Sequence, residues 1–225
     1  LCIKIYLLYL IMNLSLILSF IFIFFCTNIL IKYSLPLMGN IFKEIPNERS
    51  SHKLTKLKSG GLFFIFFILI SNIIETVFFG SRELTKVIFF CSLLSFVGFI
   101  DDLFFLSSKI RYFMQIIISF LIVNTIHPNL LIEHNYIFLL PLIFLGTIVI
   151  NFINFIDGID GLLIGCSIPL LIFSQFQSLD IQIINTLGCL FAFLKWNWDP
   201  SKIFMGDCGS NFLGALIFYF ILSNN

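Results

Sequence analysis

The chain alternates between long apolar runs and short polar segments. Several runs approach the ~20 residues that an α-helix needs to cross the hydrocarbon core of a bilayer. The pattern predicts about 8 membrane-spanning helices, the last of which reaches the C-terminus. They extend over residues 12–31, 61–79, 84–100, 110–126, 136–155, 162–176, 181–194 and from about 212 onward.

Composition supports this pattern, because 59% of the 225 residues are hydrophobic and only 11% are charged. In soluble domains roughly a quarter of all residues are charged. We therefore expect an all-α, polytopic transmembrane helix bundle that forms one integral membrane domain over residues 1–225. The net charge of +1 carries no information on partners, and no nucleic-acid partner is expected. The six cysteines are scattered without a C-x-x-C spacing, which favours buried thiols over a disulfide framework or a zinc site.

The basic residues divide unequally between the two sides of the predicted bundle. Segments after the first, third, fifth and seventh runs contain Lys32, Lys43, Arg49, Lys53, Lys56, Lys58, Lys109, Arg111, Lys195 and Lys202. The opposite side contains Lys4, Arg82 and Lys86. By the positive-inside rule, the first side faces the cytoplasm. The same side holds Asp101, Asp102, Asp157, Asp160, Asp199 and Asp207, and leaves Glu75, Glu83, Glu133 and Asp180 outside.

The segment NFINFIDGIDGL places four polar residues at successive spacings of three: Asn151, Asn154, Asp157 and Asp160. Polar groups at a membrane boundary need partners, and acids that persist there are candidates for function. The glycines at 158 and 161 allow the backbone to leave the helix and turn the acids toward a ligand. The alternative is that these residues only cap helix ends on either side of a turn.

An aspartate pair, Asp101–Asp102, directly follows the third apolar run, and Lys109 and Arg111 lie shortly after it. Adjacent carboxylates repel each other, so one of them should have a raised pKa or a cation nearby. This arrangement suits a general base beside a metal or phosphate site. The alternative is an acidic loop between two helices.

The segment WNWDPSKIFMGDCGSNFLG places Asp207 between Gly206 and Gly209, just before the last apolar run. Glycines and a helix N-terminus suit a phosphate, and a carboxylate there suits a hard cation such as magnesium. The alternative is a capped turn. In the polar segment before residue 60, Arg49 and His52 could neutralise a diphosphate or a lipid phosphate, or anchor the chain to anionic headgroups.

Together these segments resemble the polyprenyl-phosphate N-acetylhexosamine-1-phosphate transferases, a membrane superfamily also known as glycosyltransferase family 4. The matching pieces are PNERSSH with the later SGG, GFIDDLFFLSSKIRYFMQ, NFINFIDGIDGL and PSKIFMGDCGSNFLG, in the order of that family. The resemblance covers the chain from about residue 12. PNERSSH and WNWDPSKIFMGD are more similar to the O-antigen-initiating branch than to the phospho-N-acetylmuramoyl-pentapeptide transferase.

The resemblance implies transfer of an N-acetylhexosamine 1-phosphate from a UDP-sugar to undecaprenyl phosphate, with release of UMP and a requirement for Mg²⁺. Such a reaction initiates a cell-envelope polysaccharide of the O-antigen type. The resemblance also implies a bacterial inner membrane protein with its active site facing the cytoplasm. Whether the protein forms a homodimer remains open. N-acetylglucosamine, N-acetylfucosamine and N-acetylquinovosamine all remain open as the sugar.

Carried over by motif, the resemblance implies three groups of site residues. Asn154 and Asp207 would hold the magnesium. Asp101, as base or lipid-phosphate positioner, would form the catalytic group with Asp102 and Asp157. The substrate-binding residues would be Arg49, His52, Lys109, Arg111, Asn151, Asp160 facing the uracil and Phe204 stacking on it. A single site of this kind requires the carboxyl groups of Asp101, Asp157 and Asp207 to lie within roughly 15 Å of one another.

The chain also departs from the family pattern. LTKLKSGG lacks the usual prolines, DPSK replaces a P-A-K form, and Arg111 stands in place of a lysine. Family members generally continue through about two more spans with a histidine- or arginine-bearing loop. The expectation is therefore a fragment or a truncated chain, and the alternative function is a non-catalytic remnant. A cation or proton transporter is disfavoured because the acids of the motifs gather on one face.

Overall fold

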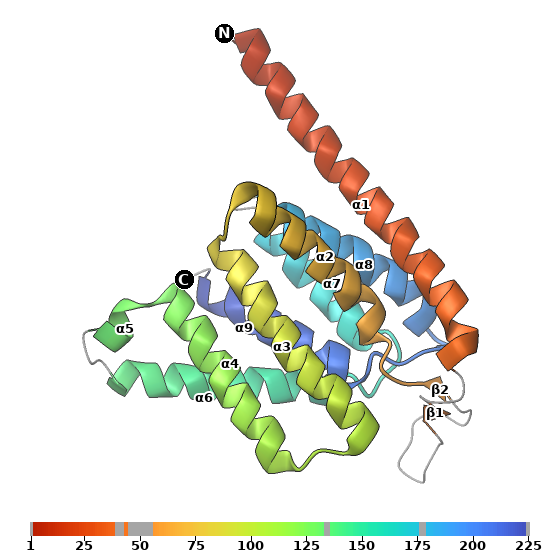
Figure 1. Ribbon diagram of the computed structural model, residues 1–225, viewed down its shortest axis with the longest axis vertical. Coiled ribbons are helices and arrows are strands. Elements are labelled where there is room, and N and C mark those ends of the chain that lie inside the picture. Colours follow the sequence, from red (N-terminus) through yellow and green to blue (C-terminus); the bar gives the residue numbers. More distant parts are fainter. Residues whose placement is uncertain (1, 39–42, 45–55, 133–135, 176–178, 224–225) are drawn as a thin grey trace.

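The computed structural model describes residues 2–38, 43–44, 56–132, 136–175 and 179–223, and these fold into a helical bundle (Figure 1). The helices are α1 (Cys2–Met38), α2 (Gly61–Phe79), α3 (Glu83–Phe104), α4 (Ser108–Ile126), α5 (Asn129–Ile132), α6 (Tyr136–Ile156), α7 (Leu162–Ser174), α8 (Ile181–Asn197) and α9 (Gly206–Ser223). A short antiparallel ribbon joins β1 (Lys43–Glu44) to β2 (Lys56–Leu57).

Each of the eight predicted spans coincides with one helix, so the expectation of a helical, polytopic membrane bundle is confirmed. Among the described residues, six helices are long and apolar enough to cross a bilayer: α1, α2, α3, α4, α6 and α9. Helices α7 and α8 have only 13 and 17 residues, which is short for a perpendicular span. The short helix α5 and the β1–β2 ribbon were not predicted.

Helix α9 forms the centre of the bundle. In its most apolar stretch of 18 residues 78% of the residues are buried, against 17–44% in the corresponding stretches of the other five candidate spans. It packs mainly against α3 and α6, and its ring of buried side chains includes Phe212, Leu216 and Phe218. The outer helices instead expose large apolar side chains such as Phe78 and Phe155, as expected for surfaces facing lipid.

Helix α1 lies against α8, and its N-terminal part projects beyond the other helices (Figure 1). The contact includes a hydrogen bond from Trp196 Nε1 to Asn28 Oδ1 at 3.0 Å. Gly188 permits the close approach, because a Cβ atom there would lie 2.9 Å from the Phe20 carbonyl oxygen. Small residues allow helix backbones to approach in membranes in this way.

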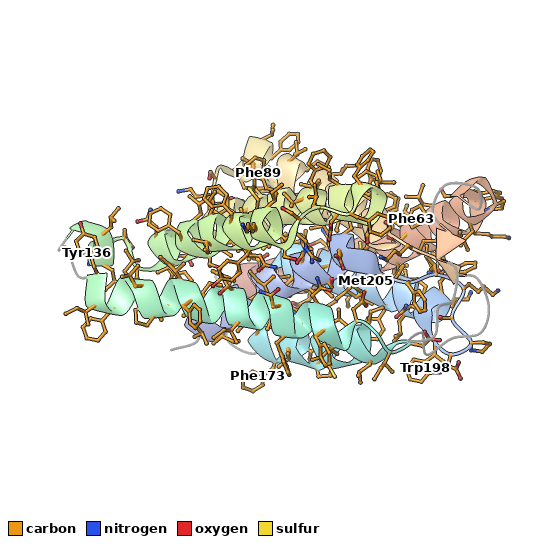
Figure 2. The ribbon with its side chains drawn as sticks, turned by 90° about the horizontal axis from the view of Figure 1, so that it is seen from below. Phe63, Phe89, Tyr136, Phe173, Trp198 and Met205 are labelled. Atoms are coloured by element: carbon orange, nitrogen blue, oxygen red, sulfur yellow. The ribbon has the colours of Figure 1, made fainter. Side chains whose placement is uncertain are left out.

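Two other glycines set the position of the N-terminal end of α9. Gly98 of α3 lies directly against the Asp207 carbonyl group, and Gly61 of α2 lies directly against the Gly209 backbone. Figure 2 labels Phe63 near this end of the bundle and Tyr136 at the opposite end, with Met205 in the interior among the packed helices. The two glycines therefore determine how closely α2 and α3 approach the start of α9.

We expect Gly98→Ala to lower the thermal stability of the detergent-purified protein, because the added methyl group would overlap backbone atoms that no rotamer change can move. Overpacking of this kind costs about 1–3 kcal/mol. Gly165→Ala is the matched control, since a Cβ atom at this helical position meets nothing within 4 Å. Equal melting temperatures for the two variants would contradict the close α3–α9 contact.

Candidate active site

The buried carboxylate of Asp102 joins three parts of the chain at one end of the bundle. Its side chain is 0% exposed and lies 3.5 Å from Lys58 Nζ. Ser59 Oγ donates a hydrogen bond to Oδ2 at 2.8 Å. The backbone N–H groups of Asp207 and Cys208 donate to Oδ1 and Oδ2 at 3.3 and 3.4 Å. Asp102 on α3 thus binds the N-terminal turn of α9 and the segment that precedes α2.

This arrangement corrects one expectation from the sequence. The first N–H groups of α9 were candidates for binding a phosphate, but in the structure they bind the Asp102 carboxylate. A carboxylate at a helix N-terminus satisfies unpaired donors and interacts favourably with the helix dipole. In the structure the Asp102 carboxylate therefore occupies the position at these N–H groups where a phosphate was expected.

Gly206 makes this close packing possible. Its φ of +73° lies in the left-handed region that L side chains rarely adopt. A Cβ atom here would lie 2.6 Å from Asp102 Oδ2 and 2.8 Å from the Ser59 nitrogen. Any side chain at position 206 would both strain the backbone and separate α9 from Asp102.

Arg111 links the aspartate pair to Asp207. Its Nη1 atom lies 3.0 Å from Asp101 Oδ2 and 3.4 Å from Asp207 Oδ2. Asp101 Oδ1 accepts the Leu106 N–H at 2.6 Å, so both Asp101 oxygens are hydrogen-bonded within the protein. The Asp101 side chain is 7% exposed, whereas Asp207 is 22% and Arg111 is 38% exposed. Asp101 therefore orients Arg111, while Asp207 and Arg111 remain accessible from outside.

Asp157 completes the cluster from the turn between α6 and α7. Burial raises the pKa of its carboxyl group well above the ordinary value, and the nearby carboxylates of Asp207 and Asp102 raise it further. The backbone of Gly206 and the charge of Lys58 oppose this shift. The carboxyl groups of Asp101, Asp157 and Asp207 therefore share one site, as the single-site expectation required.

The segment between α8 and α9 forms one wall beside this cluster. The Asn197 side chain holds it, accepting from the Gly161 N–H and donating to the Ile203 carbonyl oxygen, both at 3.0 Å. The Ser201 N–H donates to Asp160 Oδ2 at 3.3 Å. Phe204 bonds through its backbone to Leu57, and its side chain is buried, at 9% exposure.

The remaining predicted residues are more widely distributed. Asn151 forms two side-chain hydrogen bonds with Gln115 of α4, at 2.7 and 3.3 Å. Asn154 lies at the end of α6, and its backbone carbonyl accepts from the Asp157 N–H at 3.3 Å. Lys109 is exposed in the first turn of α4. Arg49 and His52 lie outside the described residues. The predicted substrate-binding roles stay predictions.

Three residues of the site were not predicted as site residues: Lys58, Ser59 and Asn197. The first two precede the glycine pair of the KSGG segment, which stood out only as part of the family resemblance. Asn197 sits at the end of an apolar helix, where an amide is usually no more than a cap. Its two partners could be identified only from the fold.

The charge balance of this cluster suits a cation. Four carboxylates, from Asp101, Asp102, Asp157 and Asp207, face two cationic side chains, Lys58 and Arg111. Within the part of the chain that the structure describes, no three His, Cys, Asp or Glu side chains are arranged to enclose a metal ion. Mg²⁺ commonly binds through one or two carboxylates together with substrate phosphates and water. The carboxylates of the cluster fit this kind of Mg²⁺ site, and they do not fit a site in which protein side chains alone surround the ion.

Comparison with known proteins gives consistent matches. The sequence model of glycosyl transferase family 4 matches residues 84–225. The chain is 29% identical over 211 residues to the phospho-N-acetylmuramoyl-pentapeptide-transferase of Prochlorococcus marinus (strain MIT 9312), covering 79% of this chain and 59% of that protein. It is 31% identical over 221 residues to the protein of the same name from Dictyoglomus thermophilum, covering 86% and 69%.

A third relative carries a different name. The chain is 30% identical over 192 residues to a probable undecaprenyl-phosphate N-acetylglucosaminyl 1-phosphate transferase of Bacillus subtilis (strain 168), covering 76% of this chain and 52% of that protein. The chain thus spans about three fifths of the length of the Prochlorococcus relative and about half that of the Bacillus relative.

We expect Asp102→Asn to destabilise the protein strongly. The carboxamide would turn an NH₂ group toward donors and leave Lys58 beside a neutral partner. Breaking a buried ion pair by removing one charge costs about 3–5 kcal/mol. Thermal unfolding in detergent measures the loss, with the exposed Asp199→Asn as the control. A melting temperature for Asp102→Asn equal to that of the control would show that the carboxylate is not a structural anchor.

Proposed function

The chain belongs to glycosyl transferase family 4, and on that basis we propose that it transfers an N-acetylhexosamine 1-phosphate from a UDP-sugar to undecaprenyl phosphate, releasing UMP. The observation that carries the proposal is the meeting of Asp101, Asp102, Asp157 and Asp207 with Lys58 and Arg111 at one end of the bundle. The names of the relatives support the same reaction class, since both name phospho-sugar transferases.

The cluster suits phosphoryl transfer because this chemistry depends mainly on positioning and charge neutralisation. Lys58 and Arg111 are 33% and 38% exposed, so their charges can reach phosphate oxygens outside the protein. A guanidinium group can bind two phosphate oxygens at once, whereas an ammonium group acts as a point charge. We assign phosphate binding to these two side chains.

The four carboxylates divide by accessibility. Asp101 and Asp102 are buried and fully hydrogen-bonded, so they hold Arg111, Lys58 and the start of α9 in place. Asp207 is accessible, and Asp157 is partly so. We therefore assign direct contact with the reactants to Asp207 and Asp157, and positioning to the aspartate pair.

We propose that Mg²⁺ binds at Asp207 and the side chain of Asn154, with substrate phosphates and water as further ligands. When bound, the ion would neutralise charge on the diphosphate while its phosphoanhydride bond breaks, a new phosphoanhydride bond forms to the lipid phosphate and UMP leaves. Two features of the chain support a cation here. Carboxylates outnumber cationic side chains, and the pKa of Asp157 is raised, first by burial and then by the neighbouring carboxylates of Asp207 and Asp102.

The finer assignment follows the sequence motifs. We propose that the reaction initiates a cell-envelope polysaccharide of the O-antigen type, in the inner membrane of a bacterium, with the acidic cluster facing the cytoplasm. The segments PNERSSH and WNWDPSKIFMGD support this branch, and the basic residues of the same face support the orientation. A radioactive UDP-sugar panel, assayed with undecaprenyl phosphate, identifies the sugar.

We expect Asp207→Asn to abolish transfer in the full-length protein and to leave it folded in the membrane. The carboxamide has nearly the same volume, but it removes the most accessible negative charge of the cluster. Asp199→Asn lies in the same loop region, is exposed, and should keep wild-type activity. The measurement is transfer of labelled sugar phosphate at saturating Mg²⁺.

If Asp207→Asn kept more than about a tenth of the wild-type activity, the substitution would have raised the activation barrier by less than ~1.4 kcal/mol. That outcome would make the metal assignment wrong. Asp207 would then be a residue that holds Arg111 and the start of α9.

The orientation is tested by cysteine labelling in a background without native cysteines. Ser107→Cys lies beside the acidic cluster, between α3 and α4, and Ser81→Cys lies at the other end of α3. Both positions are exposed. In intact cells a membrane-impermeant maleimide should label Ser81→Cys, and it should label Ser107→Cys only after permeabilisation. The opposite result would place the acidic cluster outside the cell.

A further inference from the structure

Three lysines gather at Trp196, where α1 meets the end of α8. Lys195 Nζ lies 5.9 Å from the centroid of the Trp196 ring, and Lys202 Nζ lies 5.3 Å from it. Lys32 stands one helical turn after Asn28, whose Oδ1 atom accepts a hydrogen bond from Trp196 Nε1 at 3.0 Å. Side chains four residues apart are neighbours on a helix surface. The group of Lys32, Lys195, Trp196 and Lys202 is here called the α1–α8 corner.

The corner is held together by hydrogen bonds that do not involve the lysine side chains. The bond from Trp196 to Asn28 fixes α8 against α1. The Lys202 N–H donates to the Trp196 carbonyl oxygen at 2.8 Å, so the segment after α8 folds back onto the end of that helix. This turn brings Lys202 to the same indole ring as Lys195. The positive charges therefore come from three separate parts of the chain to one place.

These charges are not compensated inside the protein. All three lysines are exposed, and in the part of the chain that the structure describes none of them forms an ion pair with a carboxylate. Between Lys195 and Lys202 the sequence contains one acid, Asp199, which is exposed. A cation–π contact uses the face of the ring and leaves ammonium N–H donors for an anion. The corner therefore has an excess of positive charge with hydrogen-bond donors to offer.

The corner lies where the lipid-facing surface of the bundle ends. On the two helices, apolar side chains precede the lysines by three or four residues and are themselves exposed, Ile29 by 54% and Phe191 by 37%. Tyr33 and Trp198 beside the lysines are 68% and 61% exposed. Exposed tyrosine and tryptophan are typical of the membrane–water interface, and lysine extends its ammonium group toward the headgroups there. Figure 2 shows Trp198 at the end of the bundle opposite Tyr136.

An anion at headgroup depth with an apolar part below it matches these features. The phosphate of a bilayer phospholipid lies at that depth, and its acyl chains can cover the exposed side chains of Ile29 and Phe191. Clusters of basic residues at the ends of membrane helices attract anionic lipids. A zwitterionic headgroup carries its own cation, which cancels the phosphate charge. Because lysine has a flexible four-carbon stem, Lys195 and Lys202 can both reach a phosphate beside Trp196.

We propose that the α1–α8 corner binds the headgroup of an anionic phospholipid of the phosphatidylglycerol kind. Lys195 and Lys202 bond to its phosphate, and Lys32 adds to the attraction. The lipid thereby joins α1 to α8 and to the segment that leads into α9. This inference rests on the packing of α1 against α8 and holds whether or not the chain is a transferase.

Tryptophan fluorescence tests the proposal, because the two tryptophans of the chain, Trp196 and Trp198, both lie at this corner. The protein is reconstituted into phosphatidylcholine bilayers that contain a rising fraction of phosphatidylglycerol with brominated acyl chains, which quench tryptophan on contact. The comparison is brominated phosphatidylcholine at the same fraction. Wild type should bind phosphatidylglycerol about tenfold more tightly than phosphatidylcholine, a difference of about 1.4 kcal/mol.

The variants separate this corner from general surface charge. Lys202→Gln should lower the preference about threefold, and the double variant Lys195→Gln with Lys202→Gln should reduce it to about one, because each lysine attracts the headgroup. Lys86→Gln is the matched control for Lys202→Gln, since it removes one exposed charge at the other end of the bundle and should keep the wild-type preference. Salt at about 1 M should weaken the preference of wild type, because it screens charges beyond about 3 Å.

The variants should melt at the wild-type temperature in phosphatidylcholine alone, because the lysines they change are exposed and form no ion pair within the described chain. Equal quenching by the two brominated lipids in wild type, or an unchanged preference in the double variant, would overturn the proposal. So would a loss of the preference in Lys86→Gln. Displacement of brominated phosphatidylglycerol by inorganic phosphate or by equimolar undecaprenyl phosphate would also overturn it, since the corner would then bind another phosphate.

Discussion

The pairing of the buried Asp102 carboxylate is the interaction on which the rest of the site depends. An isolated charge with a side chain that is 0% exposed is strongly unfavourable, so its position requires donors from all sides. These come from Lys58 and Ser59 before α2, and from the first turn of α9. Satisfying this one group therefore brings three distant segments together and determines where the central helix begins.

The same constraint separates the buried carboxylates of the cluster from the accessible one. Asp101 and Asp102 are neighbours in sequence, yet both are used internally, one for Arg111 and one for α9. Asp207, whose own N–H is bound by Asp102, keeps its carboxylate accessible. Rigid supports of this kind keep reactive groups in position without reorganisation during the reaction. The crowding of negative charge that results is the basis on which we propose a cation, and phosphates bound with it, at this site.

The two ends of the bundle handle buried polar groups differently. At the acidic cluster, glycines at 61, 98 and 206 let backbones approach until every oxygen of the aspartate pair has a donor. Between α2 and α8, Gln182 Nε2 donates to Asn72 Oδ1, whereas Gln182 Oε1 and Glu75 Oε2 lack donors within the described protein.

The sequence by itself determined the helices and the residues of the cluster, whereas the tertiary structure decided their partners. Apolar runs become helices in a membrane because the lipid offers their backbone groups no hydrogen-bond partners. The three acidic motifs stood out because charged side chains are costly beside lipid. Nothing local distinguishes Asp101 from Asp102, or indicates that Asn151 pairs with Gln115. Burial and donors at the aspartate pair depend on residues up to 106 positions away, which only the packed bundle brings within reach.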